Sequence, residues 1–314
     1  MRPEEVLDAP NAAASLLHGR LVFLLATRET QAERLLTALG SLPGVVVAPV
    51  PTHLFSEGID ELLDHWRTGL APNQGLEVFA GEQRVLLAVR RLADAVLAAI
   101  PGSATATRIV EYSPDHITGT KTIAQLYPDA TLVHVVRDGR DVAARLASPA
   151  HPRKHRLSEA PTDYVPMVGS RARHSARRWC ADQRTVRETS HPHVHVVRME
   201  DLLRTPALTL QRAAEALRID APADAIQRAV ERLGGRGRPP EHRAVRPRAL
   251  VELLCADVLA QYGYVVAHAA KSRRAAAKLE LRAEESILGG IDRLREFTLR
   301  MQMEASAGAA ETDG

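Results

Sequence analysis

Short apolar runs alternate with amphipathic stretches along most of the chain. The runs expected to form strands are residues 21–26, 44–48, 108–112, 131–136 and 193–198. The first, LVFLLA, is continuously apolar, which is typical of a parallel strand that is covered on both faces. The stretches between the runs predict helices over residues 29–39, 57–70, 76–100 and 206–218, with further helices after residues 115 and 137.

Strands that alternate with helices in this way indicate a parallel sheet with helices on both faces. We therefore expect an α/β fold with three layers, αβα, around a central parallel sheet of about five strands. Ligands of such sheets bind beyond the carboxyl ends of the strands. The residues that directly follow each strand are therefore the candidates for function.

The chain is expected to divide into an α/β domain, residues 1–265, and a C-terminal helical extension, residues 266–314, with a disordered end. From Lys271 onward the extension carries the basic segment KSRRAAAK, which suggests docking to a partner or to a second copy as a homodimer. Two further segments look like loops. Residues 149–165 are rich in proline and mixed charge, and residues 234–248 hold five arginines and one acid.

Composition narrows the class of protein. The 314 residues are 45% hydrophobic and 25% charged, which suffices for a large core. A net charge of +3 and 4% aromatic residues disfavour a nucleic-acid partner. Cys180 and Cys255 have no metal-binding spacing and indicate a reducing compartment. Because no apolar run is long enough for a membrane span and the N-terminus lacks a secretion signal, we expect a cytoplasmic protein.

The segment LLATRETQAERLL runs from the first strand through a short loop into a helix. Such a loop directs backbone N–H groups and the positive end of the helix at an anion. Arg28 adds a full charge, and Thr27 and Thr30 add hydroxyl groups. The loop has no glycine and lacks the Gly-Lys-Ser/Thr signature of nucleotide-binding loops, so an ordinary turn with a surface arginine is the alternative.

A second basic segment is HVVRDGRDVAAR, residues 134–145. It places Arg137 at the end of a buried strand and Arg145 in the following helix, for which Asp138 is the expected N-cap. An arginine beside a helix N-terminus is suited to hold a phosphate through two hydrogen bonds. The alternative is a buried structural pair between Arg137 and an aspartate.

With RIVEYSPDHI and VVRMEDLLRTPALTLQRAAEALRI, these segments resemble, in order, the sulfotransferases that use 3′-phosphoadenosine 5′-phosphosulfate (PAPS). The likeness is to the branch of bacterial, carbohydrate and tyrosyl-protein enzymes, and it spans roughly residues 20–264. It implies a P-loop-type fold, PAPS as co-substrate without a metal, and transfer of a sulfuryl group to a hydroxyl of a small molecule (a natural product) or of a glycan.

The resemblance also implies the donor site. The 5′-phosphosulfate loop corresponds to Thr27, Arg28, Glu29, Thr30 and Gln31. Arg28 falls on the basic residue that stabilises the transfer, whereas Glu29 and Thr30 replace the usual serine and glycine, so the loop is degenerate. Arg137 and Arg145 fall on the ligands of the 3′-phosphate, with Arg145 in place of a serine. In the late loop that closes over the nucleotide, the expected contacts are Arg236 and Arg238.

The base that takes the acceptor proton has three candidates. His116 and Glu111 belong to the segment that resembles the family's Glu-Lys-Thr-Pro-x-His, with Tyr112 in place of the lysine. A histidine titrates near neutrality, and burial could raise the pKa of a glutamate. His53 follows the second strand, where related enzymes often place an acidic base. The alternative for His116 is a helix-start residue that bonds to the backbone.

Two other functions remain open at this stage. Loss of glycine from the first loop, with Glu29 inside it, suggests a catalytically inactive sulfotransferase fold that binds a ligand or partner. A kinase-like or nucleotide-binding regulator is disfavoured by the absence of the Gly-Lys-Ser/Thr signature.

Overall fold

A five-stranded, all-parallel sheet forms the centre of the computed structural model, which describes residues 16–56, 58–68, 81–147, 171–233, 245–266 and a few later positions. The strand order is β2-β3-β1-β4-β5. Every strand lies within a predicted run: β1 (Leu21–Leu25), β2 (Val45–Val47), β3 (Arg108–Tyr112), β4 (Thr131–Val136) and β5 (Val194–Arg198). The predicted parallel sheet is therefore confirmed.

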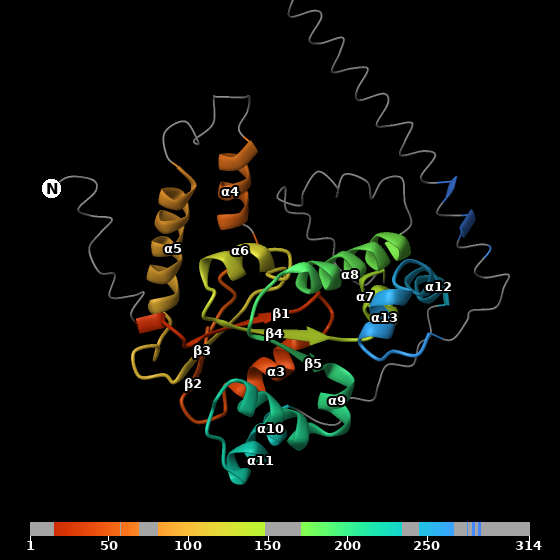
Figure 1. Ribbon diagram of the computed structural model, residues 1–314. Coiled ribbons are helices and arrows are strands. Elements are labelled where there is room, and N and C mark those ends of the chain that lie inside the picture. The colour runs from red at the N-terminus through yellow and green to blue at the C-terminus, as the bar shows by residue number, and fades with distance from the viewer. Residues whose placement is uncertain are drawn as a thin grey trace, which may run out of the picture.

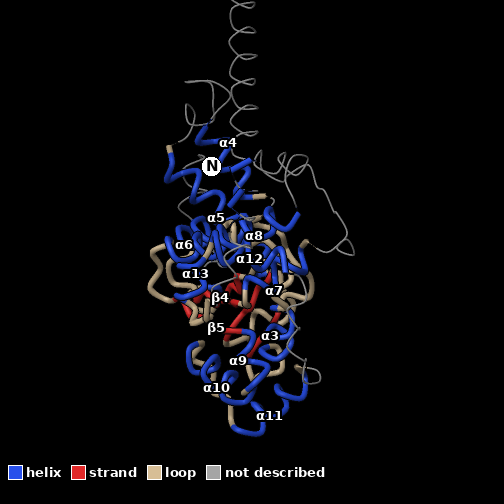
Figure 2. The backbone as a smooth tube through the Cα atoms, turned by 90° about the vertical axis from the view of Figure 1, so that its right-hand side faces the viewer, coloured by secondary structure: helices blue, strands red, loops and turns tan. Residues whose placement is uncertain are grey.

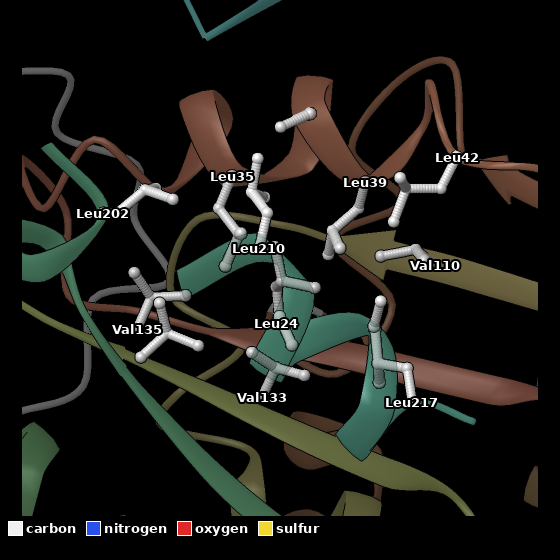
Figure 3. Packing of buried hydrophobic residues seen from close by; sticks show 14 of the residues in the cluster. Leu24, Leu35, Leu39, Leu42, Val110, Val133, Val135, Leu202, Leu210 and Leu217 are labelled. Carbon is white, nitrogen blue, oxygen red and sulfur yellow. The ribbon is translucent and has the colours of Figure 1, made fainter. Parts of the chain in front are cut away.

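Helices cover both faces of this sheet, as the two views in Figures 1 and 2 show. On one face lie α3 (Ala32–Leu39), α9 (Met199–Arg204), α10 (Pro206–Ala216) and α11 (Ala223–Arg232). Leu35 and Leu39 of α3 point toward Leu24 of β1 and Val133 of β4 (Figure 3). These side chains are fully buried, and each contributes roughly 1.5–3 kcal/mol of transfer free energy.

The opposite face is covered by α4 (Ile59–Thr68), α5 (Glu82–Ala98), α6 (Thr120–Leu126) and α8 (Arg171–Glu188). Phe23 of β1 packs there in an edge-to-face contact with Phe55, with ring centroids 5.5 Å apart. The alternating strand residues thus enter two separate cores, which confirms the three-layer α/β fold.

A third core lies beyond β4, where α7 (Gly139–Leu146), α8, α12 (Val245–Leu254) and α13 (Ala256–Gln261) meet. Trp179 of α8 is fully buried there, and Gly139 leaves the room for its ring. Cys180 and Cys255 are buried in the same core as free thiols, which donate to the backbone carbonyls of Leu254 and Ala176 respectively. This core holds α7 against the end of β4.

Some element boundaries differ from the prediction. The helix predicted from residue 29 begins at Ala32, since Glu29 and Gln31 have positive φ angles of 66° and 68°. The predicted loop 234–248 is helical from Val245 onward. Arg236, Arg238, the loop 149–165 and most of the extension 266–314 lie outside the described residues. In the described part of the chain, no helix has the length and apolar character that a membrane crossing requires.

Candidate functional site

Several residues other than glycine have a positive φ angle at the carboxyl edge of the sheet. Glu29 and Gln31 follow β1, His53 follows β2 and Asp115 follows β3, and all four have φ between 53° and 75°. A residue other than glycine that is held at a positive φ costs on the order of 1–3 kcal/mol, and such residues cluster at functional sites. The edge at which parallel α/β sheets bind ligands is therefore the candidate site.

The loop from Thr27 to Gln31 has the geometry of an anion-binding turn. Positive φ at alternate residues, 29 and 31, is typical of backbone turns whose N–H groups form a concavity for an anion. The side chain of Gln31, the N-cap residue of α3, makes no capping hydrogen bond, and the positive end of this helix lies beside the loop. The conformation expected from glycine is thus adopted by Glu29 and Gln31.

Arg28 is partly exposed in this loop and paired with a carboxylate from the next loop. Its Nε donates to Asp115 Oδ2 at 2.6 Å, and its Nη2 contacts the same oxygen. Arg178 of α8 donates to the other oxygen of Asp115 at 3.0 Å. The cation predicted for sulfuryl transfer therefore lies in a charged cluster at the sheet edge.

Glu29, the acidic residue of the loop, lies opposite Arg145 of α7. Its carboxylate is 3.8 Å from Arg145 Nη1, and both side chains are about one third exposed. Arg145 therefore balances the charge of Glu29 and lowers the repulsion that an anion in the loop would meet. Glu29 and Arg145, two of the residues that depart from the pattern of the sulfotransferases, thus face one another.

Arg137 is the most deeply buried cation of the site, with 3% of its surface exposed. Among the described residues, its Nη1 has no hydrogen-bond partner, and Asp141 lies 3.8 Å from Nη2. Burial, followed by the charge of Arg145, lowers the pKa of Arg137. A long pair with Asp141 accounts for one nitrogen only, so the guanidinium has a free donor for an anion.

A separate set of contacts fixes the start of α7 behind Arg137. Asp138 accepts from the backbone N–H of Arg140 at 2.9 Å, which confirms it as the N-cap. The side chain of Arg140 pairs with Asp138 and with Glu252 of α12. Glu200 accepts from the N–H of Asp138 at 2.9 Å. This frame holds the backbone that carries Arg137.

Glu111 and His116 form a pair with no exposed surface. The carboxylate oxygen Oε2 lies 2.7 Å from His116 Nδ1, and Oε1 accepts from Ser113 at 2.6 Å and Thr52 at 2.9 Å. Burial would raise the pKa of Glu111, but His116, Ser113 and Thr52 together lower it. His116 Nε2 accepts from the backbone N–H of Phe55 at 3.2 Å. Both predicted bases thus hold the segment 52–55 and have no contact with solvent.

His53 stands in the middle of that segment and is partly exposed. Its N–H donates to Ser113 Oγ at 3.0 Å, while its neighbours Thr52 and Phe55 bond to Glu111 and His116. The segment is therefore fixed at three of its residues, and the backbone of His53 is held at a φ of 53°. Of the three predicted bases, His53 is the one with exposed surface.

Sequence reasoning missed the contribution of α8 to this edge. Arg178 donates to Asp182 at 2.9 Å, and Gln183 donates to Thr27 Oγ1 at 3.0 Å. The i,i+4 spacing of Arg178 and Asp182 was a signal of their pairing. Their contacts to residues 27 and 115 could be seen only in the folded chain. No cluster of three or more His, Cys, Asp or Glu that could hold a metal occurs in the described ranges.

Comparison with known proteins gives one family. A model of the sulfotransferase family matches residues 29–223. No match was found among curated proteins.

Similar solved structures were also found, all at low sequence identity. The chain is similar to sulfotransferase STF9 from Mycobacterium avium, with 17% identity, 84% of this chain and 80% of that chain covered, and a TM-score of 0.50. It is also similar to a sulfotransferase from Alicyclobacillus acidocaldarius, with 14% identity, 81% and 98% covered, and a TM-score of 0.45. Mouse sulfotransferase SULT7A1 complexed with PAP gives 12% identity, 73% and 71% covered, and a TM-score of 0.38.

Proposed function

Because the chain belongs to the sulfotransferase family, we propose that it transfers a sulfuryl group from PAPS to a hydroxyl of a small molecule or a glycan. The observation that carries this proposal is Arg137, a buried guanidinium with an unpartnered Nη1 at the carboxyl end of β4. Burial of a charged guanidinium is costly unless its donors are hydrogen bonded to an anion, and a nucleotide phosphate can be that anion.

The residues around Arg137 fit a phosphosulfate nucleotide. The N–H groups of the loop 27–31 and the N-terminus of α3 suit the 5′ end, and Arg137 with Arg145 suits the 3′-phosphate. The bound donor supplies an activated sulfuryl group on a phosphate leaving group. Arg28 stabilises the charge that develops on that group, since it lies in the loop and keeps about a third of its surface exposed.

We assign His53 as the base that takes the proton of the acceptor hydroxyl. An imidazole nitrogen can accept a proton from a hydroxyl, and the backbone of His53 is fixed by its hydrogen bond to Ser113. Glu111 and His116 are positioning residues in this proposal, since their polar atoms face each other and that segment. Acceptor hydroxyls would approach the edge between β2 and β3.

Calorimetric titration with the product nucleotide PAP (3′,5′-adenosine bisphosphate) tests the donor site. Wild-type protein should bind PAP, and Arg137→Ala should bind about 10- to 100-fold more weakly, because a hydrogen bond to a charged group contributes roughly 1.5–3 kcal/mol. Arg204→Ala is the control, since Arg204 is a surface arginine with 72% of its side chain exposed. Equal affinity of both variants, or no binding to the wild type, would contradict the proposal.

A transfer assay then separates the enzyme from an inactive binding protein. Radiolabelled PAPS is incubated with panels of phenols, alcohols and oligosaccharides, with and without the protein. Labelled product that disappears in Arg28→Ala supports the enzyme. PAP binding without transfer to any acceptor or to water favours a sulfotransferase fold that serves as a ligand- or partner-binding module, for which the degenerate loop is the motivating observation.

A further inference from the structure

Four alternating charges join α8 to the two loops of the site. Arg28 pairs with Asp115, Asp115 with Arg178, and Arg178 with Asp182. The middle arginine uses two different nitrogens, Nη2 for Asp115 at 3.0 Å and Nε for Asp182 at 2.9 Å. It therefore bridges a loop residue and a residue of its own helix.

Helix α8 also contacts the donor loop next to Arg28. Thr27 precedes Arg28, and its Oγ1 accepts a hydrogen bond from Gln183 Nε2 at 3.0 Å. Thr27 is thus held by α8 directly, and Arg28 is held by α8 through Asp115. Since Gln183 follows Asp182 in α8, these contacts form a closed ring of six residues: Thr27, Arg28, Asp115, Arg178, Asp182 and Gln183.

The loop needs such support because its own sequence does not favour its conformation. Glu29 and Gln31 have positive φ without being glycine, so contacts from elsewhere must offset the cost. Asp115, which orients Arg28, has a φ of 75° itself. The hydroxyl and N–H of Thr118 both bond to the carbonyl of Asp115 and hold this turn.

From this ring we infer that Arg178 is a positioning residue for sulfuryl transfer, which holds Asp115 so that Asp115 orients Arg28 in the donor loop. The inference rests on the proposed function and deepens it. Arginine is required because its planar fork reaches two carboxylates at once, whereas the single nitrogen of lysine cannot take both places in this geometry. Arg178 has no contact with the reacting atoms in this role.

The experiment compares Arg178→Gln and Arg178→Lys with Arg184→Gln. Arg184 lies on the same helix and pairs with Asp257 at 3.2 Å on the exposed side, outside the ring. Both Arg178 variants should bind PAP within about threefold of wild type, because Arg137 is unchanged. Their kcat with labelled PAPS should fall about 10- to 100-fold, since a small displacement of Arg28 misaligns the transfer. Arg184→Gln should match wild type in both measurements.

Loss of Arg178 also leaves Asp182 without its cation, and Asp182 has 2% of its surface exposed. A thermal melt therefore accompanies each variant, and Asp115→Asn serves where Arg178→Gln does not fold. That variant keeps the shape of the side chain, removes the charge that orients Arg28, and should give the same loss of kcat.

Several outcomes would overturn the inference. Wild-type kcat in Arg178→Lys would mean that charge alone suffices, and wild-type kcat in Arg178→Gln or Asp115→Asn would mean that the ring is only structural. Loss of PAP binding in the Arg178 variants together with kcat would point to collapse of the whole site. Absence of PAP binding to the wild type would instead refute the proposed function. PAP binding to the wild type without turnover would favour the inactive sulfotransferase fold. The inference about Arg178 would fail in both cases.

Discussion

Single polar residues at this site divide into those that face solvent and those that hold others in place. Glu111 and His116 have no exposed surface, and their contacts are to each other, to Ser113 and to the segment 52–55. A buried pair of this kind adds little net stability against an apolar pair of the same shape, but removal of one partner leaves the other uncompensated. The cost of substitution is therefore larger than the contribution of the pair.

Glu111→Gln should lower the free energy of unfolding by about 3–5 kcal/mol near neutral pH. The folded protein lowers the pKa of Glu111 below its ordinary 4.5, so the stability that its charge confers is present above pH 4.5 and is lost as the pH falls through the folded pKa. Urea unfolding of both proteins at several pH values measures this. The difference between them should shrink below pH 4.5, and a constant difference would contradict the linkage.

His53→Gln tests the assignment of the base. The kcat of sulfuryl transfer should fall by about 100- to 10,000-fold, the usual contribution of general base catalysis, while PAP affinity stays unchanged. His18→Gln is the matched control, since His18 is an exposed histidine beside Asp129, away from the carboxyl edge. A kcat like that of wild type in His53→Gln would transfer the role of base to another residue.

At the scale of elements, the position of α7 depends on a glycine. A Cβ added at Gly139 would lie 2.4 Å from the ring of Trp179, which is fully buried between α7 and α12. This separation is shorter than any normal contact, and the side chains of a packed core have no room to relieve it unless the helix shifts. Since α7 begins two residues after Arg137, this packing sets the place of the buried cation.

Gly139→Ala should therefore cost about 1–3 kcal/mol of stability and weaken PAP binding at the same time. Gly81→Ala is a suitable control. Gly81 also lies at the start of a helix, as the N-cap of α5, and a Cβ there would meet no atom within 4 Å. Thermal melts and calorimetry on both variants give the comparison. Unchanged PAP affinity in a destabilised Gly139→Ala protein would show that α7 does not position the donor site.

The elements also show how far the sequence allows prediction. The runs 108–112 and 131–136 coincide with β3 and β4, because a short apolar run between turn residues has few other places to lie. The start of α3 was predicted too early, since glutamate and glutamine rarely adopt positive φ and nothing in their neighbourhood indicates it. The contact of Glu29 with Arg145, from a distant part of the chain, likewise forms only on folding.

The same distinction applies to the site. The motifs give the strands whose ends carry Arg28, Arg137 and His116, because parallel strands end at one edge. The motifs do not show which of these side chains are buried. Burial is the property that distinguishes His116, which has no exposed surface, from His53, which is partly exposed. Nor do the motifs give the contact of Asp115 with Arg178, which are 63 positions apart and meet only when α8 packs over the sheet.

For the whole molecule, stability should depend on pH through a histidine that the mechanism does not use. His134 on β4 is fully buried, and burial lowers its pKa from 6.5 to about 4. The unfolded chain binds a proton between these values and the folded protein does not, so stability falls as the pH drops from 6.5 to 4.

The loss through His134 amounts to roughly 3 kcal/mol at most. His134→Gln should remove this part of the pH dependence, as measured by urea unfolding at intervals across the window. Parallel curves for wild type and variant would mean that His134 is protonated in the folded protein too.

The place of β1 in the sheet has a consequence for synthesis of the chain. β1 is made first but lies between β3 and β4, so its partners arrive only after residue 108. At about 5–20 residues per second, the nascent segment LVFLL waits roughly 4 to 17 s without a neighbour on either edge. We expect this interval to make the emerging chain a client of chaperones, with Arg20 and Arg28 on either side of the segment as its charged gatekeepers against aggregation.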